Sequence, residues 1–425
     1  MRRRRCLQAL MAAGVTGLNG CAAPHGSALA RARVLVVGGG YAGATAAKYL
    51  RLLSDQAVDV TLVEPNPHLV SCPVSNLVIG GLRTLDDITL SYERLSSRHG
   101  VRRVQDRVVA IDPQRRTATL AGGERLGYDR LVLAPGVDFL WDRIEGLKAA
   151  HDAGRVLHAW KAGPETLALA RQIEAMPDGG TCVIAIPEAP YRCPPGPYER
   201  ACLIAARLRR THPRAKVLVL DANPDITSKA ALFRQAWKDL HPGMIEYRPQ
   251  HRVTGVDART MTLRFEVQED LRADVINLLP DMRAGDLAVH AGLATANGRW
   301  CPVDFRDFRS VHAPGLHVLG DALQIAPGMP KSGHMANAQA KVAAAAIVAE
   351  LLDLEADARP MLNNVCYSLV DTDQAIHVAS VHAWQPEQRS FVPVPGAGGL
   401  SAQRSSLEAR HAEAWARNIW ADMLG

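Results

Sequence analysis

The sequence of 425 residues is long enough for two or three domains with buried cores. Hydrophobic residues make up 48% of it and charged residues 22%, as is ordinary for a soluble globular protein. The net charge is +6, part of which lies in the first five residues, and no basic stripe interleaved with aromatic residues follows. Nucleic-acid binding is therefore disfavoured.

Residues 1–30 have the pattern of an export signal, with a basic start, a short apolar run and small residues after it. The apolar run is too short to span a bilayer as a helix. The arginine run before Cys6 and Leu7 resembles a twin-arginine signal, with cysteine in place of the usual phenylalanine. Cleavage after Ala28–Ala30 would give a soluble periplasmic product, whereas Cys21 offers a lipoprotein site that would attach the protein to a membrane.

No long uncharged apolar segment follows the signal, so we expect no transmembrane segment and a soluble or peripheral mature protein. Export would place the chain in an oxidising compartment, where a disulfide can persist. The six cysteines after Cys6 and Cys21 fit neither a zinc site nor a dense disulfide scaffold, so we predict no metal. A C-x-x-C-H motif is also absent, so the chain attaches no c-type haem.

A dinucleotide-binding fingerprint begins the globular part. The aliphatic run Val34–Val37 predicts a buried parallel strand, and an amphipathic helix is predicted from Ala42 to about Leu53. Between strand and helix the spacing is G-x-G-x-x-G, with glycines at Gly38, Gly40 and Gly43. Gly38 permits a tight turn, Gly40 permits close approach of a pyrophosphate, and Gly43 permits strand–helix packing.

An acidic residue completes this fingerprint. Glu64 ends the next predicted strand, 21 residues after Gly43, where a carboxylate can accept hydrogen bonds from ribose hydroxyls. The helix N-terminus attracts phosphate groups. With strand, glycines, helix and acid all in place, the pattern predicts a dinucleotide site.

Two later segments favour FAD over NAD. Tyr128–Gly136 is a strand that ends in a small-residue turn, and Pro314–Ala322 is a strand that ends in Gly320 and Asp321. Together with the fingerprint, they resemble the two-dinucleotide-domain flavoproteins that include glutathione reductase-like enzymes. The resemblance implies that Asp321 meets the ribityl–phosphate part of FAD.

The same resemblance implies the domain organisation. We expect an α/β fold with two Rossmann-like domains and a small C-terminal α/β domain. The FAD-binding domain would be discontinuous, over residues 31–145 and 287–355. A degenerate NAD-binding-like domain would be inserted at 146–286, and residues 356–425 would form an interface domain.

The second domain lacks a phosphate loop. Thr181–Ile186 reads as its first strand and Lys216–Pro224 holds its next one, with a helix between them. The connecting loop "PEAPYRCPPGP", residues 187–197, has prolines and a tyrosine in place of glycines. Because proline removes backbone N–H donors and fixes φ, a phosphate cradle is not expected. The sequence therefore predicts an enzyme that does not use a nicotinamide.

The same loop presents a thiol. Cys193 lies just before the predicted helix, whose N-terminus would lower the pKa of the thiol and favour the thiolate. Glu199 follows six residues later and can act as a base or a polar relay. The plainer alternative is a buried structural cysteine.

Four segments give a closer resemblance, to the flavoprotein subunit of flavocytochrome c sulfide dehydrogenase, a relative of the sulfide:quinone oxidoreductases. They are "CPPGPYERA" from Cys193, "SCPVSNLVIGG" around Cys72, "MPKSGHMANAQAKVAA" around Lys331, and "NNVCYSLV" around Cys366. The resemblance implies that Cys72 attaches covalently to FAD and that Cys193 and Cys366 form a redox-active disulfide. It also implies that the helix near Lys331 faces the flavin, where its positive end would stabilise the reduced form.

This resemblance implies a periplasmic enzyme that oxidises sulfide to sulfur or polysulfide and reduces a separate cytochrome c subunit that carries haem. The near alternative is a sulfide:quinone oxidoreductase. A quinone enzyme should have an exposed helix near the C-terminus that seats in a membrane, whereas the last predicted helix here is short and heavily charged. A non-catalytic sulfur carrier or sensor that retains FAD is the third alternative.

Overall fold

The computed structural model describes residues 31–425, so the predicted export signal and Cys21 lie outside the described residues. The first sheet is built around β1 (Arg33–Val37), which pairs in parallel with β2 (Asp59–Val63) and β9 (Arg130–Leu133). β21 (Leu316–Val318), from the other end of the chain, pairs in parallel with β9. Four of the five residues of β1 are buried, as expected for a parallel strand covered on both faces. The sheet is completed by β5 (Arg102–Val104), β19 (Val303–Asp304) and β20 (Arg309–Ser310).

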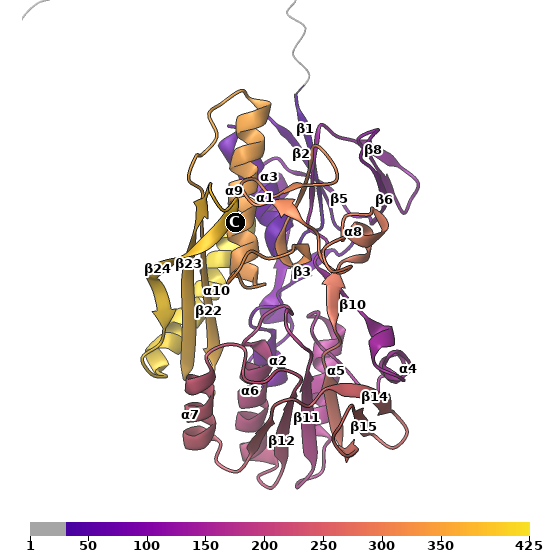
Figure 1. Cartoon of the computed structure of the whole chain (residues 1–425), viewed down its shortest axis with the longest axis vertical. Coiled ribbons are helices and arrows are strands. Elements are labelled where there is room, and N and C mark those ends of the chain that lie inside the picture. The colour runs from indigo at the N-terminus through magenta and orange to yellow at the C-terminus, as the bar shows by residue number, and fades with distance from the viewer. Residues whose placement is uncertain (1–30) are drawn as a thin grey trace, which may run out of the picture. The chain divides into compact units, whose positions relative to one another are not determined.

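Two helices pack side by side next to this sheet (Figure 1). They are α1 (Tyr41–Leu53), which follows β1, and α9 (Gly333–Leu351), which follows β21. The two helices contact each other extensively, and both bury small side chains: Ala44, Ala46, Ala47, Ala340, Ala343 and Ala344. Segments far apart in the sequence thus share one core, as predicted for a discontinuous dinucleotide-binding fold.

The second sheet has the strand order β13-β12-β11-β17, and all its pairs are parallel. Its strands are β11 (Thr181–Ile186), β12 (Lys216–Asp221), β13 (Ile245–Arg248) and β17 (Val275–Leu278). The helices of this region are α5 (Pro164–Glu174), α6 (Gly196–Thr211) and α7 (Ala230–Leu240). The strand–loop–helix unit β11–α6 is the predicted Rossmann-like unit that carries the Cys193 loop.

The C-terminal region is an antiparallel sheet with one helix. β23 (Ala375–Gln385) lies between β22 (Met361–Leu369) and β24 (Ser390–Leu400), and α10 (Ser406–Leu424) follows them. β22 contacts both α9 and α6, so this region touches both dinucleotide-type units. Three tryptophans are partly buried against the hydrophobic core around the first sheet: Trp384, Trp415 and Trp420.

Shorter elements connect these parts. The remaining strands are β3 (His68–Val70), β4 (Thr89–Ser91), β6 (Val108–Asp112), β7 (Thr117–Leu120), β8 (Arg125–Gly127), β10 (Val137–Phe139), β14 (Val253–Asp257), β15 (Thr262–Phe265), β16 (Leu271–Arg272) and β18 (Met282–Ala284). The remaining helices are α2 (Ser75–Ile79), α3 (Glu93–Ser97), α4 (Leu147–Asp152) and α8 (Asp286–His290), with 3₁₀ turns at Asp86–Ile88, Trp141–Arg143 and Gly320–Ala322.

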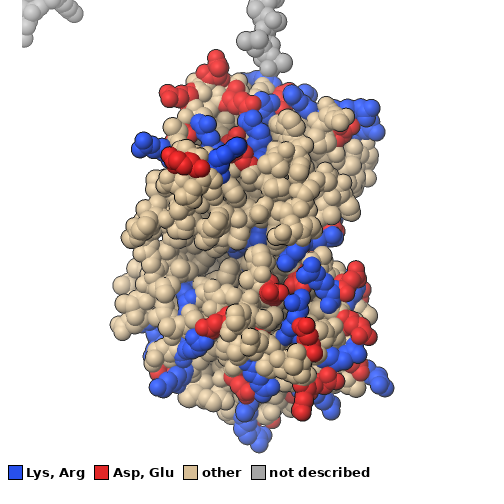
Figure 2. Space-filling model, viewed as in Figure 1, with Lys and Arg blue, Asp and Glu red and all other residues tan. Residues whose placement is uncertain are grey.

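The fold class agrees with the prediction, while the exact domain boundaries stay predictions. Among the helices of residues 31–425, none combines the length and the apolar character needed to cross a membrane. On the face shown in Figure 2, charged side chains gather toward the two ends of the described part, and few lie over β22, β23 and β24.

Candidate active site

A cavity forms where distant stretches of the chain meet. Its wall is built from the N-terminal ends of α1 and α9, from α2, from the loop before α6, and from β22. The predicted site residues that line it are Gly40, Cys72, Cys193, Glu199, Gly320, Asp321 and Cys366. The fold thus gathers the dinucleotide loop and three predicted functional cysteines around one space.

The glycine loop has the geometry that its spacing predicts. Gly38 has φ +95°, and a Cβ there would lie 2.3 Å from the carbonyl oxygen of Ala134. A Cβ on Gly43 would lie 1.8 Å from the carbonyl oxygen of Gly38, so strand and helix can meet only without a side chain. Gly40 caps α1 without a side-chain hydrogen bond and borders the cavity. The helix N-terminus is therefore open to an anionic group.

Glu64 already serves the loop itself. Its Oε2 accepts a hydrogen bond from the backbone N–H of Gly39 at 2.7 Å, and its Oε1 accepts from the backbone and side chain of Asn66. Glu64 is buried and does not line the cavity. The carboxylate fixes the turn at the helix start, and its contact with ribose stays a prediction.

Asp321 has the environment of a cofactor ligand. Gly320 before it has φ +76°, and its backbone N–H donates to Gln339 Oε1 at 3.0 Å. Burial raises the pKa of the Asp321 carboxyl, although the positive charge of Arg192 opposes that rise. Its Oδ1 is buried and has no hydrogen-bond partner among residues 31–425. An unsatisfied buried acceptor beside an open helix N-terminus fits a polyhydroxyl–phosphate group such as that of FAD.

The resemblance also implies that Lys331 itself helps to bind the cofactor. It does not line the cavity, and its Nζ donates to the backbone carbonyls of Asp321 and Leu323. The ammonium lies 3.7 Å from the centre of the Trp300 ring, and burial lowers the pKa of Lys331 to about 7. The lysine therefore stabilises the Asp321 turn, and its contact with a flavin stays a prediction. The helix N-terminus is instead supplied by α9, which begins at Gly333.

Cys72 lies on the opposite wall of the cavity. Its Sγ accepts a hydrogen bond from the backbone N–H of Ala162 at 3.5 Å and lies 3.9 Å from the carbonyl oxygen of Trp160. The positive charge of Arg192 is also close, since Cys72 is the first charged neighbour that raises the pKa of that arginine. Covalent attachment of FAD to Cys72 stays a prediction, but the thiol is placed beside the predicted cofactor space.

Cys193 and Cys366 come together although 173 positions separate them in the sequence. Both line the cavity, and Cys366 is the first charged neighbour that raises the pKa of the Cys193 thiol. Cys193 has a left-handed backbone, φ +57°, and its N–H donates to the carbonyl oxygen of Lys331 at 2.8 Å. All six cysteines of residues 31–425 are free thiols here, so the disulfide between these two stays a prediction.

The expected thiolate at Cys193 is wrong for this environment. Burial is the largest cause that raises the pKa of the Cys193 thiol, and the charges of Cys366 and Glu199 raise it further. The helix start cannot compensate, because Pro194 and Pro195 have no N–H and the N–H of Gly196 donates to the carbonyl of Cys193. The helix N-terminus therefore directs no free donor at the sulfur.

Glu199 connects three elements at the base of the cavity. Its carboxylate accepts from Asn76 Nδ2 of α2 at 2.8 Å and from the backbone N–H of Leu369 on β22 at 2.9 Å. Burial raises the pKa of Glu199. A carboxyl with a raised pKa can exchange a proton nearer to neutral pH, so the role as a base or relay stays open to Glu199.

Three buried cations at this site were not predicted from the sequence. Arg192 and Arg200 line the cavity, and Lys229 contacts the backbone of Cys366 from behind. Arg192 and Arg200 flank residues that the sequence analysis singled out, but no local pattern says that their side chains turn inward. Lys229 had no signal at all, because only the fold brings it to β22.

Hydrogen bonds between side chains hold the loop of the second domain in place. Asp221 ends β12, and its Oδ2 accepts from the hydroxyls of Tyr198 at 2.6 Å and Tyr247 at 3.1 Å. The Tyr191 hydroxyl donates to the carbonyl of Pro194 at 3.2 Å. This network fixes the Cys193 loop from the side where a nicotinamide dinucleotide would bind in a Rossmann domain.

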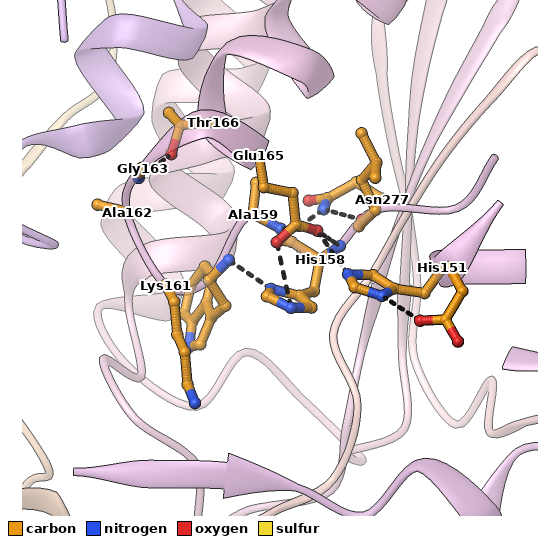
Figure 3. Close-up of polar contacts among 12 residues, drawn as sticks. His151, His158, Ala159, Lys161, Ala162, Gly163, Glu165, Thr166 and Asn277 are labelled. Carbon is orange, nitrogen blue, oxygen red and sulfur yellow. Dashed lines mark hydrogen bonds and ion pairs between the residues drawn. The ribbon is translucent and has the colours of Figure 1, made fainter. Parts of the chain in front are cut away.

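A histidine–carboxylate cluster braces the cavity wall from outside (Figure 3). The Nε2 atoms of His151 and His158 lie 3.3 Å and 3.2 Å from the Glu165 carboxylate, and the ligand atoms of the three residues all lie within 4.8 Å of one another. However, His158 Nδ1 accepts from the backbone N–H of Trp160 at 2.8 Å, so its Nε2 carries the proton and donates to Glu165. A metal-bound histidine needs the reverse arrangement, so we interpret the cluster as a brace for the Trp160 segment.

Comparison with known protein families gives three matches along the chain. Residues 166–280 match the central region of the sulfide dehydrogenase [flavocytochrome c] flavoprotein chain. Residues 358–424 match the flavin-binding region of flavocytochrome c sulphide dehydrogenase, and residues 32–168 match pyridine nucleotide-disulphide oxidoreductases. The matches cover both predicted redox cysteines and the glycine fingerprint.

Similar proteins and structures agree with these matches. The sulfide dehydrogenase [flavocytochrome c] flavoprotein chain of Chlorobaculum thiosulfatiphilum is 61% identical over 46 residues, which are 94% of that sequence and 11% of this chain. The mitochondrial sulfide:quinone oxidoreductase of Dictyostelium discoideum is 23% identical over 68% of this chain, and the alignment covers 65% of that protein. The corresponding mouse protein is covered over 66% of its length.

The fold has a solved counterpart. The sulfide:quinone oxidoreductase structure from Aquifex aeolicus superposes with a TM-score of 0.77 at 18% identity, covering 92% of this chain and 91% of that one. At this identity the likeness concerns the fold. With the family matches and the flavocytochrome c relative, it shows that the chain belongs to the flavocytochrome c sulfide dehydrogenase flavoprotein family.

Proposed function

We propose that this chain is an FAD-dependent enzyme that oxidises sulfide to zero-valent sulfur through a Cys193–Cys366 disulfide. The observation that carries the proposal is the convergence of two cysteines, 173 positions apart, on the cavity that the glycine loop and Asp321 also border. The family and the names of its relatives support sulfide as the substrate.

The charges around the cavity suit an anionic sulfur substrate. Arg192 and Arg200 line the cavity together with the carboxyls of Glu199 and Asp321, and the ammonium of Lys229 lies behind Cys366. Burial raises the pKa of both carboxyls, which moves them toward their neutral forms. An excess of positive charge in a buried site favours hydrosulfide and thiolate anions.

The chain's own sulfur atoms carry the proposed reaction. Hydrosulfide attacks one sulfur of the disulfide, so that a new S–S bond forms, the Cys193–Cys366 bond breaks and one cysteine leaves as a thiolate. Loss of one proton and two electrons from the persulfide and thiolate then gives a bridge that holds the sulfur atom in the zero-valent state. Bound FAD supplies the two-electron acceptor for this oxidation. In its ionised form Glu199 can accept this proton, because it lies on α6, which follows the Cys193 loop, and accepts from the Leu369 N–H on β22, the strand of Cys366.

We infer that a separate cytochrome c subunit takes the electrons and that the protein acts in the periplasm after removal of residues 1–30. The flavocytochrome c family supports the cytochrome, and the export pattern supports the location. The alternative acceptor is a quinone, as in the relatives named sulfide:quinone oxidoreductases. Turnover with cytochrome c and none with a soluble quinone would favour the cytochrome as the acceptor. Turnover with the quinone alone would favour the quinone.

The test is an anaerobic titration of the purified flavoprotein with sulfide, followed at the visible flavin band. We expect sulfide to bleach the wild type and neither Cys193→Ser nor Cys366→Ser. Cys301→Ala is the matched control, because Cys301 is buried in the core and does not line the cavity. If the wild type does not bleach, sulfide is not the reductant. Equal bleaching of all variants would replace the disulfide route by direct attack on the flavin.

A further inference from the structure

Lys229 is a buried lysine in an unusual backbone conformation. It precedes α7 as its N-cap with φ +59°, in the left-handed region that lysine rarely adopts. Only 4% of the residue is exposed to solvent. A strained backbone that buries a charged side chain is costly, and such sites persist where the surrounding structure enforces them.

The ammonium of Lys229 points at the strand that carries Cys366. Its Nζ donates to Ser368 Oγ at 2.7 Å and to the carbonyl oxygen of Cys366 at 3.0 Å, and it lies 5.7 Å from the centre of the Phe233 ring. No carboxylate of residues 31–425 forms an ion pair with it. Lys229 is therefore a buried cation that is hydrogen-bonded only to neutral oxygens.

The charged groups around Lys229 come from four elements. Cys366 lies on β22, Glu199 on α6, Cys193 in the loop before α6, and Glu408 on α10. Burial lowers the pKa of Lys229 to about 8, and Cys366 is the group that opposes this most. In turn, Lys229 is the largest influence that lowers the pKa of the Cys366 thiol, while Glu199 raises it and burial raises it most.

We propose that Lys229 is a positioning residue that holds Cys366 on β22 and stabilises the thiolate that Cys366 becomes during sulfide oxidation. The inference rests on the proposed function. Hydrosulfide bonds to Cys193 Sγ, the Cys193–Cys366 bond breaks, and Cys366 leaves with the electron pair while the proton stays on the outer sulfur of the persulfide. A good leaving group must be a stabilised thiolate, and a buried cation without a carboxylate partner supplies that stabilisation.

The other cations near the cysteines contact other groups. Arg200 donates to four oxygen acceptors in the cavity wall, and Arg192 lies by Cys72 and Asp321. The polar side chains that contact the Cys366 thiol are neutral: Asn364, whose Oδ1 lies 3.6 Å from Sγ, and Ser332. Among the cations named here, only Lys229 donates a hydrogen bond to Cys366, the residue whose thiolate is the proposed leaving group.

The experiment measures thiol reactivity, so no sulfide is added. The flavin-containing protein is reduced with dithiothreitol, freed of it under anaerobic conditions, and treated with iodoacetamide between pH 6 and 9. Peptide mass spectrometry follows carboxamidomethylation of Cys193 and Cys366 separately. We expect Cys366 to react faster than Cys193 in the wild type. Lys229→Met should slow Cys366 about tenfold at pH 7.5, because one pKa unit changes the thiolate fraction tenfold.

Two further variants keep the test decisive. Lys229→Arg retains the charge and should react at Cys366 within about threefold of the wild type. Lys238→Met removes an exposed lysine from the same helix and should change nothing. If Lys229→Met keeps its flavin spectrum and reacts at the wild-type rate, the inference is wrong. If that variant does not fold, a loss at Cys366 of tenfold or more in Lys229→Arg overturns it instead.

The outcome separates the two proposals. If the Cys366 alkylation rates change as expected among the Lys229 variants but sulfide does not bleach the wild-type flavin, the proposed function is overturned. The effect of Lys229 on Cys366 would then still hold. An unchanged Cys366 rate in Lys229→Met, in a protein that sulfide does bleach, would overturn the role of Lys229 alone.

Discussion

Removal of the Arg200 guanidinium tests how the cavity wall is held together. Arg200 is 1% exposed and lies on α6, and its nitrogens donate to oxygens of three other segments. The acceptors are Asn76 Oδ1 at 2.9 Å, and His158 O, Ala159 O and Asn277 Oδ1 at 2.8 Å each. We therefore predict that Arg200→Met destabilises the protein although methionine suits a buried position.

The size of the effect follows from which acceptors lose their only donor. The carbonyl of His158 keeps a hydrogen bond from Asn277 Nδ2 at 2.8 Å, so three acceptors are left unsatisfied. Each costs about 1–3 kcal/mol when buried. Methionine offsets part of this loss because it avoids the burial of a charge, whose cost is seen in the lowering of the Arg200 pKa to about 10. We expect a net loss of roughly 3 kcal/mol in the free energy of unfolding.

Denaturant unfolding of the flavin-containing protein, followed by tryptophan fluorescence, measures this loss. The control is Arg210→Met, an exposed arginine ten residues later on the same helix, which should change stability by less than about 0.5 kcal/mol. A loss below about 1 kcal/mol in Arg200→Met would refute the reasoning, since the acceptors would then have found other partners.

Three further predictions concern the cofactor and pH. Gly43→Ala places a methyl group 1.8 Å from the Gly38 carbonyl oxygen, so we expect purified protein with less than about a tenth of the wild-type flavin, read from absorbance. If Cys72 carries the flavin, acid-precipitated wild type retains the yellow colour and Cys72→Ser releases it; release from both would exclude the covalent bond. Burial lowers the pKa of His158 to about 2, so the unfolded chain alone takes up a proton below about pH 6.5. The free energy of unfolding should fall as the pH drops from 7 to 5, by up to about 1.4 kcal/mol per pH unit, and His158→Gln should flatten that fall.

The parts of the site that depend on local sequence could be predicted. The tight turn at Gly38 and the close contact at Gly43 are properties of a few consecutive residues, so their spacing alone indicated a dinucleotide loop. Asp321 was placed by resemblance, and its unsatisfied buried Oδ1 gives that placement a physical reason.

The parts that depend on side-chain direction could not be predicted. The direction of a lysine before a helix is set by what it packs against, and for Lys331 this is Trp300 and two carbonyl groups. The thiolate expected at Cys193 is wrong because burial raises the pKa of the thiol and the helix start offers no free N–H donor to oppose it. Lys229 gave no pattern, since a single lysine in a polar segment normally stays in solvent.

The second Rossmann-like unit shows why a scaffold can keep its strands and change its chemistry. Its parallel strands need only buried aliphatic residues, and β11 and β12 provide them. Phosphate binding needs free N–H groups in the loop after the first strand, and the prolines there remove them. The acid at the end of β12, Asp221, accepts a hydrogen bond from the hydroxyl of Tyr198. The same geometry that would present a loop to a dinucleotide therefore presents Cys193 to β22, with its backbone fixed by Lys331 and its loop by Tyr191.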